Sequence, residues 1–269
     1  MTKRFFMALA LLMAVPALVF AQQSQESLTI TVKGVSFKMI RVQGGTFTMG
    51  CTSEQKHNYY CNRDEEPAHN VTLYYYYIGE SEVTQELWKA VMDSNPSYFK
   101  GDSRPVEQVS WNDCQEFIRK LNELTGKKFR LPTEAEWEFA ARGGRESDNY
   151  EYSGDKDIDA VAWYWGNAGN KDKSNPDYGT HVVKTKKPNE LGIYDMSGNV
   201  CEWCSDWYGK YPDAAQFNPR GPNMSYSTNY RVLRGGGWLF TSDECRSSCR
   251  KQRQSNAKGY AVGLRLVLD

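Results

Sequence analysis

Apolar and polar residues alternate near both ends of the chain, and a helical repeat occurs only between these regions. Alternation of this kind predicts half-buried strands. The glycine pair Gly44-Gly45 interrupts the second alternating segment and predicts a hairpin turn there. The segment 71–78 contains four consecutive tyrosines, which indicate a half-buried strand at most. The segments with strand patterning are 28–32, 37–49, 71–78, 230–234 and 261–268.

Three middle segments begin with a helix start signal and continue with apolar residues at helical spacing. Thr84 is an N-cap candidate, and Ser110 and Thr133 each begin a capping box. Cys114 falls on the apolar stripe of the second helix, so we expect a buried, unpaired thiol. The acidic residues after Thr133 are better explained as partners of the helix N-terminus than as acid/base catalysts. The predicted helices lie within 84–92, 110–126 and 133–143.

From Arg145 to about residue 229 the chain shows no periodicity. The segment is rich in Gly, Asn, Asp, Pro and aromatic residues, and its many Trp and Tyr side chains argue against disorder. Loops this long normally carry function or need crosslinks. Within the stretch 191–207, short acidic and amide side chains surround Gly198. A turn of this composition can direct oxygen atoms toward a hard cation.

The first residues have the pattern of a secretory signal peptide, which we place at 1–21. Lys3 and Arg4 precede an apolar run that ends in a small residue. The run is short for a bilayer and contains Pro16, so a transmembrane anchor is not expected. We therefore expect a periplasmic or secreted protein, with 22–34 as a lead segment before the folded domain.

Charge and cysteine content narrow the class of protein. With 33 basic and 33 acidic residues the net charge is +0, so nothing indicates binding to nucleic acid. Seven cysteines in an exported chain indicate disulfides, and the odd number leaves one unpaired. A bridge from Cys51 to Cys61 would close a polar loop. Zinc bound by the CxxC and CxxxC thiolates is the rival interpretation, but an oxidising compartment favours bridges.

Seven separated motifs occur in the order found in one protein family. They are GGTFTMG (44–50), EVTQELW (82–88), PVEQVSWNDC (105–114), RLPTEAEWEFAARGG (130–144), NELGIYDMSGNVCEW (189–203), RVLRGGGW (231–238) and GLRLV (263–267). Together they resemble the sulfatase-modifying-factor family, whose founding member is formylglycine-generating enzyme. The resemblance extends over about residues 35–269, which we take as one domain.

The resemblance implies a loop-rich, irregular α+β fold, the formylglycine-generating-enzyme fold, which is related to the C-type lectin fold. In the founding enzyme, a copper ion bound by two cysteines uses dioxygen to oxidise a sulfatase cysteine to formylglycine. Two calcium ions support the fold of that enzyme. The expectations for this chain must therefore be derived position by position.

The calcium ligands of the family fall on oxygen-bearing positions of this chain. One site corresponds to Asp195, Gly198, Val200 and Glu202, where Asp195 replaces an amide and keeps an oxygen ligand. The alternative is an Asx-rich turn that forms its own backbone hydrogen bonds. The first half of the other site corresponds to Asn167 and Ala168, and its second half to a position near Asn175 or Asp177. Calcium is therefore the expected structural cofactor.

The copper site of the family does not carry over. Its second cysteine corresponds to Cys245, but its first corresponds to Phe240, which cannot bind copper. Gly237 replaces the serine that usually follows the two glycines, and Cys201 replaces the active-site tryptophan. Because two thiolates are needed to select Cu(I), copper chemistry is not expected.

The family comparison also suggests a role for the remaining cysteines. Two bridges, Cys204–Cys245 and Cys201–Cys249, would join the calcium loop to the C-terminal segment, although their connectivity stays open. The alternative is a reactive Cys245/Cys249 dithiol, kept ionised by the neighbouring Arg246 and Arg250.

The sequence therefore supports two alternative functions. The first is an exported binding or assembly module of the cell envelope that has lost copper chemistry, with a protein, peptide or glycan partner. The second is an oxidoreductase that converts a sulfatase Cys or Ser to formylglycine with Cys245 and Cys249. The three histidines are widely spaced and form no facial triad, so non-haem iron is not expected.

Overall fold

The computed structural model describes residues 26–56, 61–224 and 229–269. The predicted signal peptide and the first part of the lead segment lie outside these ranges. None of the described helices is long and apolar enough to cross a membrane.

The largest sheet has five strands in the order β1-β2-β5-β12-β6, and all neighbours are antiparallel. Lys33 and Gly34 join its first two strands, and both have positive φ (46° and 84°), as a tight hairpin turn requires. The predicted first strand is thereby confirmed. The strands are β1 (Ser27–Val32), β2 (Val35–Val42), β5 (Tyr76–Gly79), β12 (Val267–Leu268) and β6 (Phe129–Arg130).

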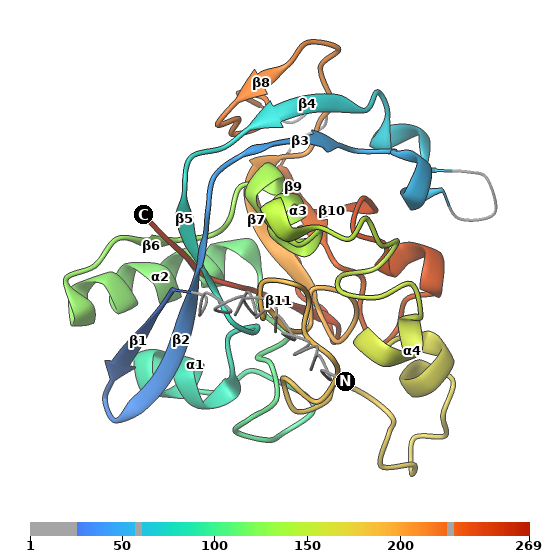
Figure 1. Cartoon of the computed structure of the whole chain (residues 1–269). Helices are drawn as coiled ribbons and strands as arrows, with labels where there is room; N and C mark the ends of the chain where they lie inside the picture. The colour runs from blue at the N-terminus through green and yellow to red at the C-terminus, as the bar shows by residue number, and fades with distance from the viewer. Residues whose placement is uncertain (1–25, 57–60, 225–228) are drawn as a thin grey trace, which may run out of the picture.

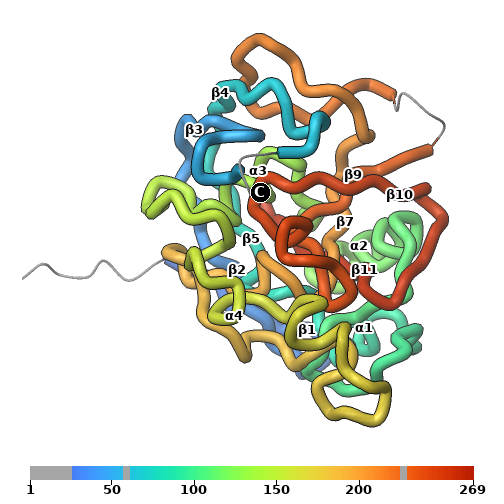
Figure 2. The backbone as a smooth tube through the Cα atoms, turned by 90° about the vertical axis from the view of Figure 1, so that its right-hand side faces the viewer, coloured from blue at the N-terminus to red at the C-terminus, as the bar shows by residue number. Residues whose placement is uncertain are grey.

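Two smaller sheets complete the β structure (Figure 1). One has the order β10-β9-β7-β11 and the other the order β3-β4-β8; the pairs β7–β11 and β4–β8 are parallel. Figure 2 shows the four-stranded sheet toward the viewer with α2 beside it. The strands are β3 (Thr46–Met49), β4 (His69–Thr72), β7 (Cys201–Trp207), β8 (Gln216–Phe217), β9 (Tyr230–Arg234), β10 (Arg250–Gln254) and β11 (Val262–Gly263).

The predicted hairpin at Gly44-Gly45 is wrong. The strands on either side of it, β2 and β3, belong to different sheets. A Cβ on Gly44 would lie 2.3 Å from the backbone oxygen of Leu73, so glycine is needed where the two chain segments pass each other. At the same crossing the predicted strand over 71–78 is divided between β4 and β5.

The three predicted helices are confirmed, and each has the expected cap. The side chains of Thr84, Ser110 and Thr133 accept hydrogen bonds from the first turns of their helices. The helices are α1 (Gln85–Met92), α2 (Trp111–Thr125), α3 (Glu134–Ala141) and α4 (Ile158–Val161). Single turns are η1 (Ser53–Gln55), η2 (Arg63–Glu65), η3 (Gly144–Glu146), η4 (Trp165–Gly169) and η5 (Ser242–Cys245).

The two largest apolar clusters of the core lie one on each side of β7. The first packs α1 and α2 against the five-stranded sheet, and the second surrounds α3, whose Trp137 is fully buried. Successive side chains of a strand point to opposite faces. Cys201 and Trp203 therefore lie in the first cluster and Cys204 in the second. Strand β7 was not predicted, because its buried residues do not alternate with polar ones.

Candidate functional site

The segment 235–250, which carries the two candidate catalytic cysteines, follows β9 directly. Gly235 and Gly236 have positive φ (92° and 68°), so the chain turns sharply as it leaves the strand. A Cβ on Gly236 would lie only 2.5 Å from Sγ of Cys245. The backbone thus covers this thiol, and Cys245 has no exposed surface.

Neither candidate cysteine has the properties of a reactive thiol. Burial raises the pKa of Cys245 far above its ordinary value, and burial raises the pKa of Cys249 to about 12. Both thiols are therefore protonated at neutral pH, whereas the thiolate is the nucleophile and the metal ligand. A buried cysteine of this kind packs as a small apolar residue.

The neighbouring arginines bind carboxylates, which corrects the expectation that they keep a dithiol ionised. Arg246 donates two hydrogen bonds to the carboxylate of Glu65, at 2.6 and 2.8 Å. Arg250 donates two to Glu134, at 2.6 and 2.8 Å. All four side chains are buried. The positive charges are thus balanced by carboxylates.

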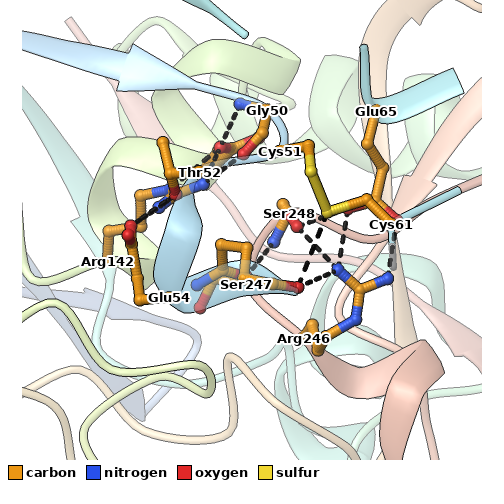
Figure 3. Close-up of polar contacts among 12 residues, drawn as sticks. Gly50, Cys51, Thr52, Glu54, Cys61, Glu65, Arg142, Arg246, Ser247 and Ser248 are labelled. Carbon is orange, nitrogen blue, oxygen red and sulfur yellow. Dashed lines mark hydrogen bonds and ion pairs between the residues drawn. A yellow bond between two sulfur atoms is a disulfide. The ribbon is translucent and has the colours of Figure 1, made fainter. Parts of the chain in front are cut away.

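A network joins the cysteine segment to the disulfide loop near the N-terminus (Figure 3). The predicted Cys51–Cys61 bridge is present. Inside this loop, the backbone oxygen of Gln55 accepts a hydrogen bond from Arg246 at 2.7 Å, and its side-chain oxygen accepts one from the backbone of Ser248 at 2.9 Å. The disulfide loop therefore fixes the cysteine segment from one side.

Carboxylates of α3 fix the segment from the other side. Glu134 also accepts a hydrogen bond from Arg234, and Glu138 accepts hydrogen bonds from Arg234 and Arg142. Glu136 accepts from the backbone of Thr133, as a capping-box residue does. The prediction that these carboxylates serve the helix N-terminus is therefore right for Glu136 and wrong for Glu134, which forms buried ion pairs.

The predicted bridges Cys204–Cys245 and Cys201–Cys249 are absent. All four cysteines are free and buried, as is Cys114, which was expected to be unpaired. Cys201 and Cys204 lie in different core clusters, so the pair cannot act together toward the C-terminal cysteines. Among the described residues no group of three or more His, Cys, Asp or Glu side chains could hold a metal ion.

The predicted calcium loop has the charge for a cation but not all of the expected side-chain ligands. The carboxylate of Glu202 accepts hydrogen bonds from Trp137 at 2.6 Å and from Arg265 at 2.7 Å, so it is already engaged. Asp195 accepts one from the backbone of Lys184. A cation here would therefore depend on Asp195 and on the predicted backbone carbonyls of residues 198 and 200.

A third buried carboxyl group, that of Glu82, lies beside this loop. Glu82 accepts hydrogen bonds from the side chain of Asn199 and the backbone of Val200. Burial and the nearby carboxylates of Asp195 and Glu202 raise its pKa well above the ordinary value. Burial likewise raises the pKa of Asp195 to about 6. Three buried carboxyl groups thus lie near a single buried arginine, Arg265.

The other predicted calcium residues lie in η4. The amide oxygen of Asn167 accepts a hydrogen bond from the backbone of Tyr164, and its nitrogen donates to Asp159 and to the backbone oxygen of Ala162. Ala168 is buried. The side chain of Asn167 therefore forms hydrogen bonds within and beside its own turn, as a capping residue does.

Exposed and half-buried aromatic residues gather around the buried ring of Trp238. We call Tyr98, Phe99, Trp165, Tyr178, Trp238 and Tyr260 the aromatic face. Apart from Trp165, its rings are in contact with one another: Tyr98 lies 5.0 Å from Tyr260 and 5.0 Å from Phe99, and Phe99 lies 5.1 Å from Trp238. Tyr98 and Tyr260 keep 61% and 48% of their surface exposed.

Sequence reasoning missed the aromatic face and the ion pairs. The aromatic residues come from loops without periodicity, so the sequence contains no signal that they meet. Glu65 and Arg246 are separated by a long stretch of chain and follow no shared motif. Only the high aromatic content, 13%, hinted at a surface of this kind.

Comparison with known proteins agrees with this architecture. A family model described as the sulfatase-modifying factor enzyme 1-like domain matches residues 31–269. Chaperone protein LppX of Paenibacillus barcinonensis is 36% identical over 275 residues, which cover 87% of this chain and 90% of that protein. Formylglycine-generating enzyme of Streptomyces coelicolor is 36% identical over 168 residues, or 60% of this chain and 50% of the enzyme.

Among solved structures, Treponema denticola variable protein 1 superimposes with a TM-score of 0.76 and 33% identity, covering 90% of this chain and 98% of that one. The loop-rich α+β fold expected from the motifs is therefore confirmed. The matched residues include nearly the whole described chain. The chain belongs to the sulfatase-modifying-factor family.

Proposed function

We propose that this protein is an exported binding module of the cell envelope that engages a protein partner and lacks copper-dependent formylglycine-generating activity. The observation that carries the proposal is the state of Cys245, which is covered by the Gly235–Gly237 turn. Its thiol is fully buried and protonated at neutral pH.

The surroundings of this thiol support the loss of copper chemistry. Phe240 stands at the position of the other copper ligand and packs in an apolar cluster with Cys245. Cys249 is buried as well. With a phenyl ring in place of one thiolate, no pair of soft ligands is available to select Cu(I).

The aromatic face supports binding as the remaining function. Exposed aromatic rings contribute most to protein recognition when they are held rigidly, because little side-chain entropy is lost on binding. The ring contacts of Tyr98, Phe99 and Trp238 provide that rigidity. A relative that covers most of this chain is named a chaperone protein, which favours an incompletely folded protein as the partner.

The loss of copper chemistry can be tested on the purified mature protein. The protein is loaded with copper and incubated under oxygen with a peptide of the CxPxR type, and the peptide mass is measured. We expect no conversion to the aldehyde. Conversion that disappears in Cys245→Ser would overturn the proposal and establish the oxidoreductase alternative.

The binding role has its own test. Unfolded, reduced lysozyme aggregates and scatters light, and we expect the mature protein to suppress this scattering at a stoichiometric ratio. The double variant Tyr98→Ala/Tyr260→Ala should lose most of the suppression, whereas Leu124→Ala, another exposed apolar residue, should keep it. Equal suppression by both variants, or none by the unaltered protein, would refute the aromatic face as the binding surface.

We further propose that calcium supports the 195–202 loop. The excess of buried carboxylates over Arg265 favours a cation, with Asp195 as the side-chain ligand. Calcium would supply charge balance and rigidity to this irregular loop, not chemistry.

A further inference from the structure

A second concave site lies apart from the aromatic face. It is a groove with a volume of about 610 Å³, between the β4–β5 connection, β6 and the loop after β8. The volume is within the range of ligand pockets, about 300–1,000 Å³. Figure 1 shows β8 above β4 and the C-terminus beside β5. The residues that matter below are Tyr74, Tyr75, Arg130, Asn218, Arg220 and Asp269.

Aromatic rings form one wall of this groove. Tyr74 and Tyr75 keep 66% and 59% of their surface exposed, which is unusual for adjacent tyrosines inside a folded domain. The ring of Phe217 contacts Tyr74 edge-on at 4.9 Å, and the guanidinium of Arg41 lies 5.0 Å from the ring centre of Tyr75. Both tyrosine rings are therefore supported from the side and remain open to a ligand.

Polar groups of both kinds line the rest of the groove. The backbone of Tyr74 donates to the side-chain oxygen of Asn218, which leaves the amide nitrogen of Asn218 as a donor. Arg220 forms no ion pair with any residue that the structure describes. Arg130 already binds the carboxylates of Glu136 and Asp269. Donors and acceptors are thus both present.

The charges of the groove cancel. Arg130 and Arg220 contribute two positive charges, and Glu136 and Asp269 contribute two negative ones. Because Arg130 is already paired with carboxylates on two sides, an anionic ligand would have to compete for it. A neutral ligand meets no such competition.

We propose that this groove binds a neutral oligosaccharide of two or three pyranose rings. The apolar face of a pyranose can stack on Tyr74 and Tyr75, and its hydroxyl groups can accept from Arg220 and Asn218 and donate to Asp269. A peptide is less well matched, since Leu73 and Pro219 are the groove's aliphatic side chains and neither forms a deep anchor pocket. The proposal does not depend on the role of the aromatic face.

The experiment uses the purified mature protein and three neutral probes, namely chitotriose, cellotriose and maltotriose. Binding is measured by saturation-transfer NMR and calorimetry. We expect saturable binding of at least one probe, a loss of about tenfold in affinity in Tyr75→Ala, and a comparable loss in Arg220→Ala. Both side chains are exposed, so melting temperatures should stay unchanged and show that the variants fold.

Leu124→Ala is the matched control, because it removes an exposed apolar side chain that belongs neither to the groove nor to the aromatic face. It should bind the sugar as the unaltered protein does. Failure of all three probes to bind, or equal affinity in Tyr75→Ala, would overturn the oligosaccharide proposal without affecting the protein-binding role. An unfolded protein client that competes for the groove and is lost in Tyr75→Ala would replace the sugar by a peptide ligand.

Discussion

Glu65 is the residue whose removal should disturb the cysteine segment most. Its carboxylate accepts two hydrogen bonds from Arg246 and one from the hydroxyl of Ser248, and no part of its side chain is exposed. Substitution Glu65→Ala leaves the guanidinium of Arg246 buried without the carboxylate to which it is hydrogen-bonded. The predicted result is a large loss of stability with no change at the surface.

The magnitude follows from the burial of the pair. Removing one partner of a buried ion pair costs about 3–5 kcal/mol of unfolding free energy. For a domain of this size each kcal/mol lowers the melting temperature by about 2–4 °C, so Glu65→Ala should lower it by roughly 6–20 °C. The exposed pair Arg119–Glu123 is the matched control, because Glu123→Ala should cost about 0–1 kcal/mol.

Thermal unfolding and urea titration of the two variants measure this difference. A second readout is the rate at which Ellman's reagent modifies thiols in the folded protein, which should rise in Glu65→Ala because the cysteine segment loses its anchor. The double variant Glu65→Leu/Arg246→Met should recover part of the stability, since no charge is then left buried. A loss in Glu65→Ala no larger than that in Glu123→Ala would refute the reasoning.

The pH dependence provides an independent check. Burial alone would raise the pKa of Glu65, but hydrogen bonds from Arg246 and Ser248 outweigh burial and hold the pKa below its ordinary value. The stabilisation is therefore complete above the pKa of the unfolded chain, about 4.3, and is lost as the pH falls through the lower folded-state pKa. The stability difference between the unaltered protein and Glu65→Ala should shrink in acid.

Three further outcomes are expected. Burial raises the pKa of Glu107 to about 7. The contribution of Glu107 to stability therefore falls as the pH rises from about 4.3 to 7. The variant Glu107→Gln does not titrate and should flatten that part of the Tm–pH curve. Thiol titration should give five free thiols after denaturation without reductant, whereas three bridges would leave one. Calcium at a hundredfold excess over Kd should add about 2.7 kcal/mol and raise Tm, and EDTA or Asp195→Ala should abolish the rise; no response would exclude the site.

The sequence was sufficient for elements with a local signal. Each helix begins at a capping residue that satisfies backbone donors a few positions away, so Ser110 or Thr133 identifies its helix without any tertiary information. The same holds for the disulfide between Cys51 and Cys61, which closes a short loop. Motifs then supplied the fold class through the resemblance to one family, and the family match over residues 31–269 confirms that resemblance.

Features that depend on distant contacts could not be predicted in this way. The glycines at 44 and 45 have the composition of a turn, but Gly44 is constrained by the backbone of Leu73 in the connection between β4 and β5. The arginines beside the cysteines carry the charge that would activate a thiol, but their partners Glu65 and Glu134 come from elsewhere in the chain. Nothing local distinguishes an activating arginine from one in a buried ion pair.

The geometry of β7 explains why the CxxC pair is not a redox site. In a strand each residue advances about 3.3 Å, so Cys201 and Cys204 are separated by about 10 Å, whereas a disulfide requires Cα atoms within about 7 Å. An odd spacing also places the two thiols on opposite faces, each in its own apolar cluster. They cannot bridge to each other, and only one of them can face any given partner. The CxxC spacing that suits a helix or turn therefore places, in a strand, one cysteine in each of two apolar clusters.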